Sequence, residues 1–199
     1  MKSVFKKTDG KIVAIDGKCL RRSFDKSKGF LVIHMLSAWA TENGVVMGQQ
    51  KVDSKSNAIT AIPKLLFLLE CKGCIFTMDT MGCQKGIAED IMSKEADYVL
   101  GLKANQRQTL GEVEMSFDTS FARSIKVHEF ESIDSGHGRI ETRRYTSMSA
   151  AGIKNLSSWV GCKSAVMVES VREKKSTGQS SRETRYYISS LAPEKIEQI

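Results

Sequence analysis

The first hundred residues carry a succession of apolar patterns that few folds can accommodate. Apolar residues recur with strand or helix periodicity in seven segments, in the order strand, strand, strand, helix, strand, helix, strand: residues 12–15, 30–40, 45–52, 59–69, 74–78, 87–92 and 98–102. The pair Asn43-Gly44 lies between the second and third strands and favours a tight hairpin. The later strands alternate with helices, which favours parallel strands joined by right-handed crossovers. This order predicts an antiparallel meander that continues into crossover units.

The second half of the chain is predicted to be rich in strands. A polar helix begins near Asn105, and four strands are expected after it, at residues 126–132, 139–147, 159–171 and 185–190. The tract 172–185 is almost entirely charged or small and polar, so we predict that it forms a solvated hairpin tip. The whole pattern predicts an α/β protein with a ribonuclease-H-like mixed sheet, flanking helices and a β-rich second half. We expect a basic leader at 1–11 and one domain at 12–199.

Composition narrows the class of partner and the cellular location. Thirty Lys and Arg residues against 23 Asp and Glu give a formal net charge of +7, which favours phosphate-rich partners. The apolar stretches are far shorter than the roughly 20 residues of a membrane-spanning helix, and Met1–Lys11 is polar and lysine-rich, so we expect a cytoplasmic protein. The five cysteines are expected to be reduced. Cys71-x-x-Cys74 lacks two further ligands at the spacing of a zinc site.

Two carboxylates stand where apolar strands end. Asp16 follows the run 12–15, and Asp79 follows the run 74–78, each with a glycine close behind. If the two strands are neighbours, the carboxylates converge and repel each other, and a cation such as Mg²⁺ would relieve the repulsion. Two metal ions held in this way can cut a phosphodiester bond. The alternative is that each aspartate only begins a turn, because its side chain accepts hydrogen bonds from backbone N–H groups.

Several longer motifs resemble the H-repeat-associated insertion-sequence transposases of the DDE superfamily. The similarity extends from about residue 9 to 192, and the motifs that carry it stand in the family's order: Ala14–Ser23, His34–Ala38, Lys55–Asn57, Thr77–Gln84, Tyr98–Lys103 with Asn105-Gln106, and His137–Arg143. The resemblance implies DNA transposition, with Asp16 and Asp79 as the first two catalytic aspartates and Mg²⁺ or Mn²⁺ as cofactor. It also implies two kinds of DNA as partners, the ends of the insertion sequence and the target.

Relative to that family, the sequence is expected to be a central fragment. Family members have a helical domain before the first aspartate, and a later helix with the pattern His-Trp-x-Ile-Glu-Asn carries the third catalytic carboxylate. Neither stretch is found in these 199 residues. The resemblance therefore predicts a truncated enzyme that is inactive alone, and that pairs with a second copy or with full-length transposase.

Basic residues near the motifs are candidates for DNA contacts. Guanidinium groups bind phosphate oxygens in a bidentate manner and hold a duplex without reading its sequence. The candidates are Lys18, Arg21, Arg22, His137, Arg139 and Arg143. For Arg139 and Arg143 the alternative is a solvated basic strand face, and His137 could instead cap a turn with Gly136 and Gly138.

Two other functions remain open. A stand-alone nuclease of the same fold would use Glu141 as its third carboxylate, although in the family this motif accompanies the catalytic glutamate. A noncatalytic fragment would occupy DNA or inhibit the full-length enzyme.

Overall fold

The computed structural model describes residues 11–20, 33–52, 58–123, 125–136 and 138–198. The chain separates into two compact units, Met1–Leu100 and Gly101–Ile199, and each is described by itself. The expected division into a leader and one domain stays a prediction, because most of the leader lies outside the described residues.

The first unit contains a five-stranded mixed sheet in the order β3-β2-β1-β4-β5. β1, β2 and β3 form the predicted antiparallel meander, whereas β4 pairs parallel to β1 and β5 pairs parallel to β4. This change from hairpins to crossovers is the ribonuclease-H-like arrangement that the sequence predicted. The elements are β1 (Ile12–Leu20), β2 (Ile33–Ala40), β3 (Val45–Val52), α1 (Ala58–Leu68), β4 (Ile75–Met78), the 3-10 turn η2 (Thr80–Gly82), α2 (Lys85–Ser93) and β5 (Asp97–Leu102).

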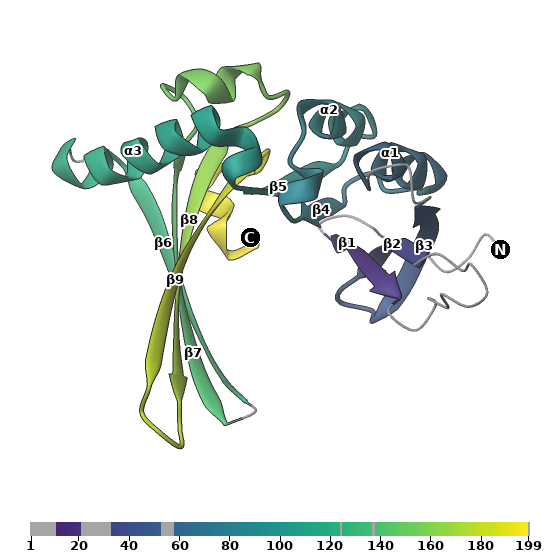
Figure 1. The fold of residues 1–199 in the computed structure, drawn as a ribbon. Helices are drawn as coiled ribbons and strands as arrows, with labels where there is room; N and C mark the ends of the chain where they lie inside the picture. The colour runs from purple at the N-terminus through teal and green to yellow at the C-terminus, as the bar shows by residue number, and fades with distance from the viewer. Residues whose placement is uncertain (1–10, 21–32, 53–57, 124, 137, 199) are drawn as a thin grey trace. The chain divides into compact units, whose positions relative to one another are not determined.

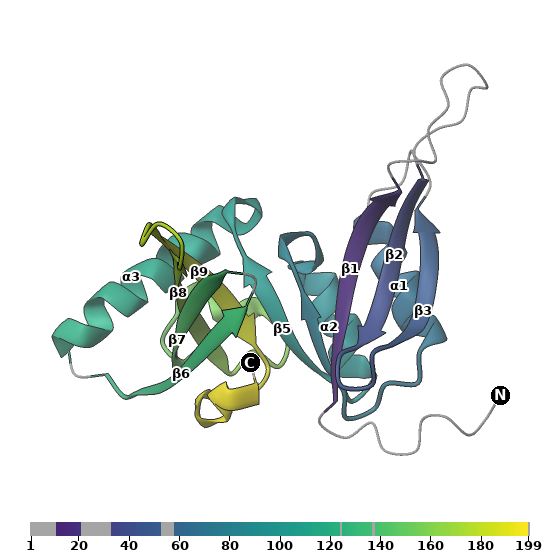
Figure 2. The same ribbon diagram turned by 90° about the horizontal axis from the view of Figure 1, so that it is seen from below.

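The two helices of this unit cover one face of the sheet. Figures 1 and 2 show α1 and α2 on the same side of the strands. The approach of α1 is close at Gly48 of β3, where a Cβ atom would lie 3.2 Å from the side chains of both Leu65 and Leu69. Pro63 lies inside α1, further along than the first turn. The residues that α1 and α2 bury include Ile62, Leu65, Leu66, Ile87 and Ile91.

The second unit is built on a four-stranded antiparallel sheet in the order β9-β8-β7-β6. Its long helix α3 packs on this sheet, with the rings of Phe117 and Tyr186 6.0 Å apart, as can be followed in Figure 1. The Glu112 carboxylate on α3 accepts a 2.8 Å hydrogen bond from the backbone N–H of Asn155 in η4. The elements are η3 (Ala104–Gln106), α3 (Arg107–Arg123), β6 (Val127–Gly136), β7 (Arg139–Ser149), η4 (Lys154–Ser158), β8 (Ser164–Lys174), β9 (Ser180–Ser189) and η5 (Pro193–Gln198).

The predicted hairpin tip at 172–185 is wrong in extent. β8 continues to Lys174 and β9 already begins at Ser180, so the ladder runs through most of the charged tract. The strands persist because cross-strand ion pairs replace apolar contacts, and opposite charges across a ladder stabilise it. The predicted strand at 159–171 also begins too early, because Trp159 follows the 3-10 turn η4 and is buried.

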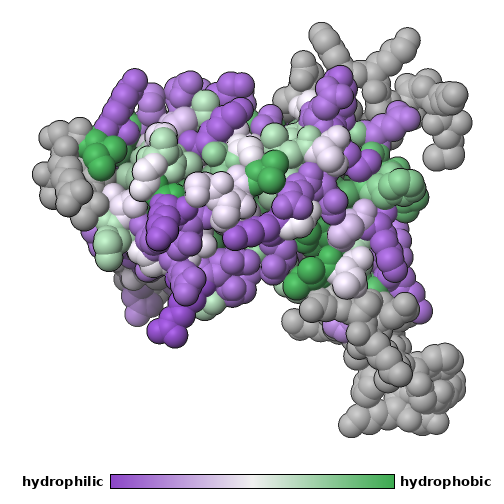
Figure 3. Space-filling view, turned by 90° about the horizontal axis from the view of Figure 1, so that it is seen from above, coloured by the Kyte–Doolittle hydropathy of each residue, from purple (hydrophilic) through white to green (hydrophobic). Residues whose placement is uncertain are grey.

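The described surface is largely hydrophilic where it can be seen. On the face shown in Figure 3, hydrophilic side chains predominate and apolar ones form small groups. Among the described residues, no helix is long and apolar enough to cross a membrane. The order of helices and strands in the two units confirms the predicted mixed α/β class with a β-rich second half.

Candidate functional site

Two neighbouring strands bring the predicted aspartates together. Asp16 was expected at the end of its strand, but β1 stays paired with β2 up to Leu20, so Asp16 lies in the middle of β1, whereas Asp79 directly follows β4. In the parallel ladder of β1 and β4, Ile15 pairs with Met78, and Asp16 and Asp79 are the next residues on each strand. Asp79 keeps an extended backbone, with φ −75° and ψ −172°. Residues at matching positions on parallel strands present their side chains to the same face. Both aspartates are exposed, so both carboxylates are open to a ligand.

The two aspartates belong to the sheet face opposite the helices. Val13 and Ile15 on β1 are buried, and Ile15 is level with Ala38 of β2 and Gly48 of β3, over which α1 packs. Alternation along β1 then directs Asp16 to the other face. On that face Asp16 is level with Ser37, whose hydroxyl accepts a 3.1 Å hydrogen bond from the Gln49 amide.

A tight turn fixes Asp79 at the end of β4. Its Oδ1 accepts a hydrogen bond of 3.1 Å from the N–H of Met81, and its carbonyl oxygen accepts one of 3.0 Å from the N–H of Gly82. Gly82 is buried against Met78, and a Cβ atom there would lie 2.6 Å from the Met78 Cβ. Asp79 therefore does begin a turn, as the alternative interpretation proposed. The same turn also holds its carboxyl group at the end of the strand.

The donor set suits a hard divalent cation but is incomplete. Carboxylate oxygens are the ligands that Mg²⁺ takes from proteins, together with water and phosphate oxygens. Within the ranges that the structure describes, no group of three or more His, Cys, Asp or Glu residues could hold a metal ion. Asp16 and Asp79 therefore offer two carboxylates, and further ligands would come from water, substrate or residues beyond those described. The thiols of Cys71, Cys74, Cys83 and Cys162 are reduced.

The basic candidates fall into three groups. Arg21, Arg22 and His137 lie outside the described residues. Lys18 is exposed on β1, two residues after Asp16 and on the same face of the sheet, and Arg139 is exposed at the start of β7 in the second unit. Arg143 is engaged within the protein, because its Nε donates a 2.9 Å hydrogen bond to Glu141 Oε1.

Glu141 is held between two arginines. It is buried on β7, and its Oε1 also lies 3.2 Å from the Nε of Arg172, directly across the ladder on β8. Burial alone would raise the pKa of the Glu141 carboxyl, but the hydrogen bonds and charges of Arg143 and Arg172 outweigh it, so the pKa is lowered. A metal ion at Glu141 would have to displace both guanidinium groups.

The ion pairs continue onto β9, and sequence reasoning missed this part. Arg172 Nη1 lies 3.5 Å from Glu183, and Arg185 donates hydrogen bonds of 2.8 and 3.0 Å to the same carboxylate. Arg185 accordingly holds the pKa of Glu183 below its usual value. A signal was present in the sequence, because the tripeptide Glu-Thr-Arg occurs at 141–143 and again at 183–185.

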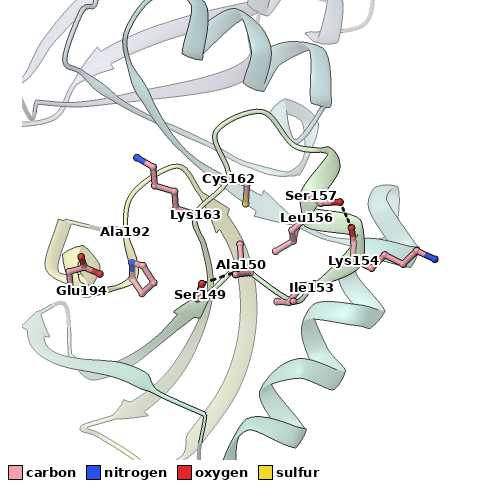
Figure 4. A pocket seen from close by; sticks show the side chains of 13 residues that line it. Ser149, Ala150, Ile153, Lys154, Leu156, Ser157, Cys162, Lys163, Ala192 and Glu194 are labelled. Carbon is pink, nitrogen blue, oxygen red and sulfur yellow. Dashed lines mark hydrogen bonds between the residues drawn. The ribbon is translucent and has the colours of Figure 1, made fainter.

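A shallow hollow in the second unit contains none of the predicted residues. It has a volume of about 630 Å³ and lies between the segment after β7, the start of β8 and the segment before η5 (Figure 4). Its polar groups include Ser149, Lys154, Lys163 and Glu194. The hydroxyl groups of Ser149 and Ser157 already bond to nearby backbone atoms, so this hollow offers no assembled catalytic group.

Comparison with known proteins gives consistent matches. The family described as transposase DDE domain matches residues 7–187. "Putative transposase YncI" of Escherichia coli O157:H7 is 44% identical over 186 residues, covering 92% of this chain and 48% of that protein. "H repeat-associated putative transposase YhhI" of Escherichia coli K12 is 37% identical over 196 residues, covering 96% and 51%. The "Uncharacterized protein in dhlA 3'region" of Xanthobacter autotrophicus is 40% identical over 179 residues, covering 89% and 59%. The chain spans about half the length of the curated relatives it matches.

Proposed function

Since the chain belongs to the transposase DDE domain family, we propose that it acts in DNA transposition and supplies two metal-binding aspartates for cutting and joining DNA strands. The observation that carries this proposal is the β1–β4 register, in which Asp16 and Asp79 directly follow the last paired residues, Ile15 and Met78. Both belong to the open sheet face and both are exposed.

In this mechanism the two aspartates would hold Mg²⁺ or Mn²⁺ against a DNA phosphate. A bound divalent ion supplies charge that stabilises the attacking and leaving oxygens of the phosphodiester. Asp79 is held in place for this role by the Met81 N–H and by the turn that follows it. Lys18 lies on the same sheet face as Asp16 and would contact the phosphate backbone beside the scissile bond. Arg139 would bind phosphates elsewhere on the duplex.

Two carboxylates are too few for efficient strand transfer. Strand transfer of this kind uses two metal ions, and the second ion needs ligands that a third carboxylate would supply. Misplacing the reacting groups by about 1 Å can lower the rate roughly a hundredfold. We therefore expect the 199-residue chain to bind metal and DNA weakly and to leave DNA uncut. Activity should return when a segment that carries a third carboxylate is supplied in trans.

Metal binding tests the site directly. Mn²⁺ binding to the 199-residue chain can be followed by electron paramagnetic resonance in the wild type and in Asp16→Asn and Asp79→Asn. Each variant should bind Mn²⁺ more weakly, whereas Asp134→Asn, which removes an exposed carboxylate of β6, should bind as the wild type does. Equal binding by all four proteins would remove Asp16 and Asp79 from the proposed site.

Cleavage separates the proposal from the stand-alone nuclease. The purified chain is incubated with Mg²⁺ or Mn²⁺ and a duplex that carries the ends of its parent element. Cutting that is abolished by Glu141→Gln as well as by Asp16→Asn would establish the nuclease instead.

Noncatalytic DNA binding is the second candidate function. It is favoured by the lack of a three-ligand group among the described residues. Such a chain would occupy DNA ends or pair with the full-length enzyme, and excess chain would then inhibit transposition in cells.

A further inference from the structure

Four ion pairs of the second unit form one connected chain on one sheet face. Glu141 and Arg172 are direct partners across β7 and β8, and Ser170 is level with both Arg143 and Glu183. Residues that are paired, or two apart on one strand, share a face. The contacts therefore run Arg143–Glu141–Arg172–Glu183–Arg185 across three strands. We refer to Arg143, Arg172 and Arg185 as the arginine row.

The arginine row has more charge and more donors than its glutamates use. Within this chain of contacts, three guanidinium groups meet two carboxylates, so the network itself carries one more positive charge than negative. Each guanidinium carries five N–H donors, and the glutamate contacts of each arginine engage two of its three nitrogens. The side chains of Arg143, Arg172 and Arg185 are 44%, 38% and 46% exposed, whereas that of Glu141 is 9% exposed. An approaching ligand would meet guanidinium groups, with the Glu141 carboxylate beneath them.

We infer that Glu141 is a positioning residue, which together with Glu183 holds the arginine row in place to bind the phosphates of duplex DNA. This inference rests on the proposed function for the identity of the partner. A guanidinium that is already held in one direction loses less conformational entropy when it binds a phosphate. Exposed ion pairs contribute little to stability, so the orienting effect is the larger consequence of the network. Glu141 contacts and orients Arg143 and Arg172, and Glu183 does the same for Arg172 and Arg185.

The opposite face of the same sheet supplies matched controls. There Arg144 pairs with Glu131 at 3.3 Å, and Arg182 pairs with Glu169. These residues alternate with the arginine row along β7 and β9, so they point away from it. Glu131→Gln removes the same charge as Glu141→Gln, and Arg144→Ala removes the same charge as Arg172→Ala.

The sign of the change in affinity for Glu141→Gln tests the inference. The 199-residue chain is titrated into a fluorescent DNA duplex over a series of salt concentrations. Loss of one negative charge would strengthen DNA binding if long-range attraction alone mattered. Loss of a positioning residue should instead weaken it, by about fivefold, because each arginine that loses its fixed direction costs roughly twofold to tenfold in affinity. Glu131→Gln should bind DNA as tightly as the wild type or more tightly.

Salt dependence and metal binding complete the test. Arg172→Ala should lower the slope of log K against log salt by about 0.9, the value for one phosphate contact on a duplex, and Arg144→Ala should leave the slope unchanged. Glu141→Gln should leave Mn²⁺ binding unchanged, whereas loss of a metal ligand would weaken it. Glu183→Gln, at a more exposed carboxylate, should weaken DNA binding in the same direction and covers the case in which the buried Glu141→Gln variant does not fold.

Two results would overturn the inference while leaving the proposed function in place. Tighter or equal DNA binding by both glutamine variants at 141 and 183 would show that the glutamates only screen charge, while DNA binding itself stood. Weaker Mn²⁺ binding by a folded Glu141→Gln would make Glu141 a ligand. Failure of the wild-type chain to bind any duplex at low salt would instead refute the proposed function, and the inference with it.

Discussion

Replacing Gly82 by alanine should displace Asp79 from its position beside Asp16, because the added methyl group would clash with Met78. An added Cβ atom would lie 2.6 Å from both the Cβ and the Sδ of Met78, and 3.0 Å from its Cγ. The sulfur can swing aside, but the Met78 Cβ is fixed to β4, which is held between β1 and β5. The turn that begins at Asp79 must therefore move outward. Overpacking of this kind costs about 1–3 kcal/mol, so we expect a loss of about 2 kcal/mol in the free energy of unfolding.

Gly86→Ala is the matched control for that experiment. Gly86 lies in the first turn of α2, and a Cβ atom there would have no atom within 4 Å. Alanine is the better helix former, so this variant should gain up to about 1 kcal/mol. Urea unfolding measures both changes, and Mn²⁺ binding reports whether Asp79 has moved.

The two measurements together test the reasoning. Gly82→Ala should be less stable than the wild type and should bind Mn²⁺ more weakly, whereas Gly86→Ala should bind Mn²⁺ normally. Unchanged stability in Gly82→Ala would refute the close packing of the turn on Met78. Lower stability with unchanged Mn²⁺ binding would show that the turn does not position Asp79.

Three further predictions concern packing and pH. Gly48→Ala should destabilise the first unit by about 1 kcal/mol in urea, because the new Cβ would lie 3.2 Å from the side chains of Leu65 in α1 and Leu69 just after it. Phe117→Ala should cost about 3–5 kcal/mol, because its buried ring joins α3 to β9, whereas the exposed Met115→Ala should change stability by less than about 0.5 kcal/mol. The folded-state pKa of Glu141 is lowered from 4.5, so its ion pairs stabilise the protein above pH 4.5 and this contribution is lost as the pH falls through the folded-state pKa. The free energy of unfolding, measured from pH 4.5 downward, should fall more steeply in the wild type than in Glu141→Gln. Parallel curves would show that the Glu141 ion pairs do not stabilise the protein.

Much of the first unit was predictable because its strands have an apolar face or a buried centre. The bounds of β3, Val45–Val52, agree with the prediction, and the hairpin at Asn43-Gly44 forms with Gly44 at a positive φ of 61°. The adjacency of Asp16 and Asp79 was predicted on the condition that their strands are neighbours, and β1 and β4 do pair. Their catalytic role stays a prediction.

The second unit was less predictable because solvent reaches both faces of the sheet where β8 ends and β9 begins. At 172–174 and 180–185 the side chains are charged or polar in succession, so the apolar alternation that marks a strand is missing. The environment of Glu141 was equally hidden from the sequence. Its partner Arg172 is brought to it by the register of β7 and β8, which no local pattern specifies.

The placement of β1 also has a consequence for the order in which the protein folds. β1 pairs with β2, the next strand in the sequence, but its other neighbour β4 arrives only after β3 and α1 have been added to the chain. Contacts between residues far apart in sequence form late, because a long loop must first be closed. The second unit, by contrast, joins its strands through successive antiparallel neighbours. We therefore expect the two aspartates to become neighbours only in a late, long-range step, and a nascent chain that ends before β4 has no partner strand to place beside Asp16.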